Sequence, residues 1–164
     1  MTDDEKTIQR DRMRFTKNSL SSNLVYLAIL ADVFFFVSIY KSDVGSYYYN
    51  ILIGASIIYN LVFMLAAFLS SEGVKNYNMT YSYVLLILGV IQIVRIFIIP
   101  VRAHSAVVAV GEAATQVMGN GQFARVVIYL LISAACCLVS AVVGVARSRA
   151  LSEHVASLNG TAPV

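Results

Sequence analysis

Charge and tryptophan are what this sequence lacks most. Of its 164 residues only 13% are charged and none is tryptophan, whereas an ordinary soluble domain carries about 25% charged residues. Hydrophobic residues make up 59% of the chain, more than a soluble domain of this length could cover with polar surface. The composition therefore predicts an all-α integral membrane protein, whose apolar side chains face lipid.

Cysteine is also scarce. The two cysteines, Cys136 and Cys137, are adjacent in an apolar run. Neighbouring Cα atoms lie only about 3.8 Å apart, a geometry that strains a disulfide bond. Because the chain has no C-x-x-C motif, it has no pattern typical of thiol redox chemistry. We interpret both cysteines as small side chains that face lipid or another helix.

The sequence also has no signature for catalysis, a cofactor or a metal. Its two histidines, His104 and His154, are expected on opposite sides of the membrane and so predict no metal site. An intramembrane hydrolase would need a nucleophile beside a base, and neither Ser38 nor Ser56 has an evident base. We therefore expect a protein that is not an enzyme and that binds no cofactor.

Four apolar runs are long enough to cross a bilayer. They occupy residues of about 20–40, 48–69, 81–99 and 125–145, and about 20 helical residues cross a hydrocarbon core of about 30 Å. The first run is too long for a cleaved signal peptide, and Lys41-Ser42-Asp43 follows it where a small-residue cleavage site would stand. We predict a four-helix membrane bundle over residues 20–146, with polar tails at 1–19 and 147–164.

The connections between these runs are short, with one exception. Residues 70–75 predict a turn after the second span. The long connection, residues 101–124, instead predicts a short amphipathic helix on the outer surface. Glu112 and Gln116 lie on the polar face of this helix, opposite its apolar residues. The apolar residues that repeat there at helical spacing are Val107, Val110, Ala114 and Val117.

Lysine and arginine near the span ends predict the orientation. With the N-terminus inside, the cytoplasmic segments carry Lys6, Arg10, Arg12, Arg14, Lys17, Lys75, Arg147 and Arg149. The outer segments carry only Lys41, Arg102 and Arg125. This bias predicts cytoplasmic tails at both ends, in the inner (plasma) membrane of a bacterium. Acidic residues sit among the N-terminal basic ones, so the sequence predicts no nucleic-acid binding.

The most informative polar residues are Asp32 in the first predicted span and Arg95 in the third. A charge at the bilayer centre costs at least about 2.5 to 3.5 kcal/mol, so such residues usually turn inward and find a partner. Both spans run outward, and at 1.5 Å per residue the two positions differ in depth by only about 3 Å. We predict an intramembrane ion pair, which is either an inert structural lock or a site for an ion or small charged solute. A third interpretation has Arg95 alone reaching the outer boundary.

Further polar residues are expected to form one inward-facing strip with Asp32 and Arg95. Ser56 and Asn60 share one face of the second span, and Gln92 precedes Arg95 by one turn. An amide within a membrane needs a partner on another helix, so Asn60 and Gln92 are expected either to join helices or to support the site.

Small residues repeat every four positions on the fourth span. They are Ser133, Cys137 and Ala141 on one row, and Cys136, Ser140 and Gly144 on the next. Small side chains at this spacing allow another helix backbone to approach closely. The approaching helix belongs either to this chain or to a second protein.

A small basic cluster is expected on the outer side. Arg102, His104 and Arg125 lie near Arg95 in predicted depth. They either contact an anionic lipid headgroup or carboxylate, or act as ordinary anchors at the membrane boundary.

Of three four-span families of similar size, none has motifs in this chain specific enough to assign its residues. Small multidrug transporters are similar in having one acid in the first span, but they are shorter and carry a tryptophan that this chain lacks. The glycine-rich signature of fluoride channels and the paired boundary cysteines of quinone-linked thiol oxidoreductases are both missing.

Two functions remain open. The first is association: an accessory or scaffold subunit of a membrane complex, or a homo-oligomer, as the small-residue face of the fourth span and the charged tails suggest. The alternative is a small dimeric transporter or channel that uses Asp32 and Arg95 for an ion or small charged solute.

Overall fold

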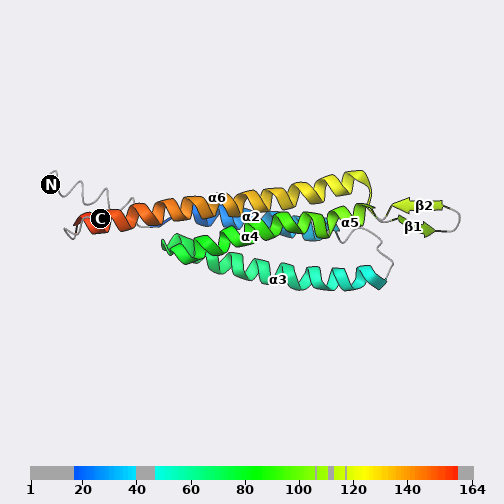
Figure 1. Cartoon of the computed structure of the whole chain (residues 1–164), viewed down its shortest axis with the longest axis horizontal. Coiled ribbons are helices and arrows are strands. Elements are labelled where there is room, and N and C mark those ends of the chain that lie inside the picture. Colours follow the sequence, from blue (N-terminus) through cyan, green and yellow to red (C-terminus); the bar gives the residue numbers. More distant parts are fainter. Residues whose placement is uncertain (1–16, 40–46, 106, 111–112, 117, 159–164) are drawn as a thin grey trace.

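The computed structural model describes residues 17–39, 47–105, 107–110, 113–116 and 118–158. Its long elements are helices α2 (Ser19–Ile39), α3 (Tyr47–Lys75), α4 (Met79–Ile98) and α6 (Asn120–Leu158), which lie side by side (Figure 1). All four are long and apolar enough to cross a membrane. The chain is therefore a multi-pass membrane protein built as a helix bundle, which agrees with the expectation from composition.

Each long helix packs against two of the others. Helix α6 lies along α2 and α4, and α3 packs against the same two helices less extensively. Helices α2 and α4 therefore occupy opposite corners of the bundle and run in the same direction. The start of α2, the turn between α3 and α4 and the second half of α6 meet at one end of the bundle (Figure 1).

Burial in the bundle is inverted relative to a soluble protein. Many interior positions hold small or polar side chains, while large aliphatic ones lie outside. Ile58, Leu65 and Val142, for example, are 66%, 62% and 65% exposed. Such a surface suits contact with lipid, where apolar side chains carry no cost.

Serine side chains join the helices at the end where α2 begins, which we call the serine end. The hydroxyl of Ser140 on α6 donates to the carbonyl of Ser21 on α2 (2.8 Å), and the Ser21 hydroxyl donates back to the Ser140 carbonyl (2.6 Å). The hydroxyls of Ser22 and Ser71 lie 2.7 Å apart and join α2 to α3. These contacts between side chains and backbone need close helix approach, which the small residues permit.

The predicted turn at residues 70–75 is wrong, because α3 continues to Lys75. Ser71 is buried against Ser22, and Glu72 pairs with Lys75 at 3.0 Å one turn later along the helix. The turn follows instead at residues 76–78, where Tyr77 has a φ of 60° and Asn78 caps α4 by accepting a hydrogen bond from the Thr80 amide.

The predicted outer amphipathic helix is also wrong. After the short helix α5 (Pro100–Ser105), strands β1 (Val107–Val110) and β2 (Ala113–Gln116) form an antiparallel hairpin, with Val110 opposite Ala113. β-Branched valines favour an extended backbone, and Gly111 stands in the sequence between the two strands, as is common in hairpins. Val117 and Glu112 lie outside the described residues.

We predict that Gly144→Leu destabilises the bundle. A Cβ added at Gly144 would collide with the hydroxyl of Ser82 on α4, and overpacking of this kind costs about 1 to 3 kcal/mol. Thermal unfolding in detergent measures the effect. The control is Val142→Leu, on the exposed side of the same helix, which should leave the melting temperature unchanged. Equal melting temperatures for the two variants would contradict the packing described here.

Candidate functional site

An ion pair crosses the centre of the bundle from corner to corner. Nη1 of Arg95 on α4 donates to Oδ1 of Asp32 on α2 at 3.0 Å. The two side chains are 5% and 1% exposed. The pair forms because α2 and α4 run in parallel and carry their single charge at similar depth, and because arginine is long enough to reach across the diagonal.

All four long helices contribute to the surrounding hydrogen bonds. Gln92, one turn before Arg95, donates from Nε2 to Asp32 Oδ1 (3.0 Å) and to the hydroxyl of Ser133 on α6 (3.3 Å). Nη2 of Arg95 donates to the hydroxyl of Ser56 on α3 at 2.9 Å. We call Asp32, Ser56, Gln92, Arg95 and Ser133 the polar network.

Two aromatic rings enclose the guanidinium. Cζ of Arg95 lies 4.2 Å from the ring centre of Phe35 and 4.6 Å from that of Tyr59. Both are cation–π contacts, which strengthen where water is excluded. The sequence reasoning missed these two residues, although Phe35 follows Asp32 and Tyr59 follows Ser56 by one helical turn.

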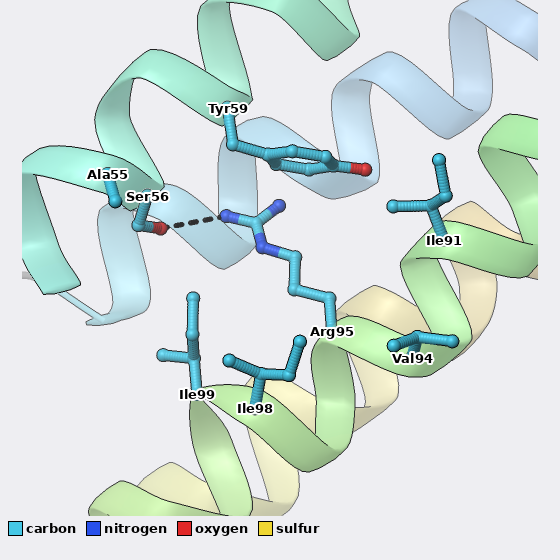
Figure 2. Close-up of a pocket in the computed structure, with 8 residues that line it drawn as sticks. All are labelled: Ala55, Ser56, Tyr59, Ile91, Val94, Arg95, Ile98 and Ile99. Carbon is cyan, nitrogen blue, oxygen red and sulfur yellow. Dashed lines mark hydrogen bonds between the residues drawn. The ribbon is translucent and has the colours of Figure 1, made fainter.

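A cavity of about 200 Å³ lies between α3 and α4 beside the polar network. In Figure 2, the Arg95 guanidinium projects into this space, with the Tyr59 ring above it and Ser56 at its end. The remaining lining is apolar and consists of Ala55, Ile91, Val94, Ile98 and Ile99. The cavity thus has a mostly aliphatic lining and one cationic group, the Arg95 guanidinium.

Several buried polar atoms of the site have no hydrogen-bond partner among the described residues. They are Oδ2 of Asp32, Nε of Arg95, the hydroxyl of Tyr59, and both amide atoms of Asn60. Leaving a buried donor or acceptor unpaired costs about 1 to 3 kcal/mol. Asp32 therefore retains an unpaired acceptor and Arg95 an unpaired donor, and each could bind a polar group.

The small-residue face of α6 lies inside this chain. Ser133, Cys137, Ser140 and Ala141 are all at most 1% exposed, and Gly144 is buried close to Ser82 and Ser21. The approaching backbones that the sequence left unassigned are therefore those of α2 and α4. Cys136 and Cys137 are both buried, and neither forms a disulfide with a described residue.

The predicted outer basic residues are held locally. The ring of His104 stacks on Phe123 at 4.5 Å, and its Nδ1 lies 3.1 Å from the carbonyl of Met118. Nε of Arg125 donates to the Gly121 carbonyl of its own helix, and the side chain of Arg102 is exposed. A lipid-headgroup contact for these three residues stays a prediction.

Comparison of the chain with protein families, with curated proteins and with solved structures finds no match. The function is therefore argued from the site alone.

We predict that Asp32→Leu destabilises the bundle by about 3 to 5 kcal/mol, because it leaves the Arg95 charge buried without its counter-ion. The double variant Asp32→Leu with Arg95→Met should recover most of this loss, since it removes both charges. Unfolding free energies in bicelles are measured for Asp32→Leu, for Arg95→Met and for the double variant. A double variant as unstable as the sum of the single ones would mean that the two residues are not coupled.

Proposed function

We propose that this protein binds a small charged solute at Asp32 and Arg95 and carries it across the membrane. The observation that carries the proposal is the cavity into which the Arg95 guanidinium projects (Figure 2). A charged group in contact with such a space offers a ligand an electrostatic interaction that lipid or water does not weaken.

An inert structural lock explains fewer of these features. A lock requires only that acid and base satisfy each other, whereas Asp32 Oδ2 and Arg95 Nε have no partner within the described part of the chain. A lock also needs no adjacent space. Intramembrane ionisable residues beside a cavity are typical of solute and ion pathways.

The proposed orientation places both tails in the cytoplasm. In the described residues the serine end carries Lys17, Lys75, Arg147 and Arg149, and the opposite end carries Arg102 and Arg125. Basic residues favour the cytoplasmic side. The cavity then lies in the outer half of the membrane, which we take to be a bacterial inner membrane, with the chain acting as a homodimer.

We predict that Asp32→Asn abolishes solute flux in liposomes reconstituted with the full chain. An amide keeps the size of the carboxylate but cannot neutralise Arg95, so the cation retains the solute and turnover stops. The control is Glu72→Gln, which removes an acid outside the polar network. Flux in Asp32→Asn that equals wild-type flux would overturn the transport proposal.

A second candidate function, an accessory or scaffold subunit, is favoured by the end of α6. Arg147 on α6 contacts Asn18 beside the start of α2 at 3.2 Å, and α6 continues to Leu158 past the other helices (Figure 1). Its residues there include exposed charges and the half-exposed Val155. A helix that continues beyond the other described helices (Figure 1) suits docking to another protein.

We predict for this second function that a partner co-purifies with the chain in mild detergent and is lost in Val155→Glu. A charge at this position would disturb an apolar contact without touching the bundle core. Ser152→Glu, which adds the same charge at an exposed polar position of the same segment, is the control. A chain that purifies without a stoichiometric partner would exclude the scaffold function.

A further inference from the structure

The cavity beside Arg95 opens sideways, through the lipid-facing surface of the bundle. Four of its lining residues, Ala55, Ile91, Val94 and Ile98, are exposed. The side chains of the last three are 39%, 49% and 46% exposed, and all three are aliphatic. In a membrane-spanning bundle, such a rim meets acyl chains. A ligand that enters here comes from the bilayer and must be partly apolar.

One edge of the guanidinium lies at the wall of this cavity with an unpaired donor, Nε, which is buried, so a ligand reaches it only after a small shift of the side chains around it. Nη1 of Arg95 donates to Asp32 and Nη2 to Ser56, while Nε finds no acceptor among the residues that the structure describes. Figure 2 shows Nε and Nη2 on the side of the guanidinium that faces Ile99. The N–H groups along this edge of an arginine are parallel and fit the two oxygens of one carboxylate.

The size of the cavity limits the ligand. Its volume of about 200 Å³ is more than ten times the roughly 10 to 15 Å³ that one water molecule needs on the same measure. That space accepts a carboxylate and the first few methylenes of a single chain, whose remainder would lie along the aliphatic rim.

We infer that the site binds the carboxylate of a single-chain amphiphile, such as a medium-chain fatty acid, which enters from the bilayer between α3 and α4. The inference rests on the proposed function and names its substrate class. Arg95 holds the carboxylate through Nε and Nη2, and the Ser56 hydroxyl lies beside it. The bound carboxylate and Asp32 compete for one positive charge, because two anions on one cation are unfavourable in low dielectric. This competition gives the ligand a means of release.

The test uses the full chain in phosphatidylcholine nanodiscs and a decanoate that carries a photoreactive diazirine near its carboxylate. Cross-links mapped by mass spectrometry should fall in segments 55–59 and 91–99. Unlabelled decanoate should compete with the probe, whereas decanol should not. Equal competition by decanol would overturn the inference, since the site would then be only an apolar slot. Equal competition by phosphatidylglycerol would overturn it in favour of a lipid headgroup.

Two pairs of variants sharpen the result. Ala55→Phe fills the mouth of the cavity from an exposed position and should lower labelling at least tenfold. Ile58→Phe adds a ring at another exposed position of the same helix, outside the cavity lining, and should leave labelling unchanged. With both variants measured below their own melting temperatures, Arg95→Gln should abolish labelling, whereas Asp32→Asn should increase it severalfold because the competing anion is gone. Unchanged labelling in Ala55→Phe, or reduced labelling in Asp32→Asn, would overturn the inference.

Flux measurements separate this inference from the function on which it rests. If acetate flux depends on Asp32 while decanoate does not label the cavity, transport stands and the amphiphile is the wrong substrate class. If decanoate labels the cavity as described while Asp32→Asn leaves decanoate flux unchanged, the substrate class stands and transport by this site is overturned.

Discussion

The high cost of an unpaired charge in lipid is the constraint on which this bundle depends. Asp32 and Arg95 lie on helices at opposite corners, and burying either charge without the other costs about 3 to 5 kcal/mol. Their contact fixes the rotation of α2 and α4 about their own axes and the depth of each relative to the other. Apolar packing alone would not fix these quantities, because lipid competes equally well for aliphatic side chains.

The remaining polar residues are arranged around that pair. Gln92 donates to the acid and to Ser133, and Ser56 accepts from the base. The rings of Phe35 and Tyr59 cover the guanidinium. These contacts involve every long helix, so the network joins the whole bundle. Some buried donors and acceptors, such as Arg95 Nε and Asp32 Oδ2, nevertheless have no partner among the described residues. The cavity lies on the α3 side, where the helix packs less extensively than α6 does.

The sequence predicted the central features because membrane burial leaves few alternatives for polar residues. Two opposite charges at similar depth on parallel spans predict a pair. Helical spacing also placed Ser56 and Gln92 on inward-facing positions. The sequence did not predict the hairpin, because its valines repeat at a spacing that fits a helix while their branching favours a strand. It also misplaced the end of α3, since buried serines that bind another helix look like turn residues in a sequence.

The last turns of α3, at the serine end, are joined to a neighbouring helix by hydrogen bonds between side chains, whereas its first turns lie farther from α4 (Figure 1). Ser21 and Ser22 tie α2 to both of its neighbours there, whereas Figure 1 shows α3 diverging from α4 toward its own first residues. Backbone amides exchange with solvent deuterium according to how readily the local structure opens. Hydrogen exchange should therefore progress along α3 from its beginning toward Lys75. The last amides to exchange should be those near Ser71, whose hydroxyl contacts Ser22.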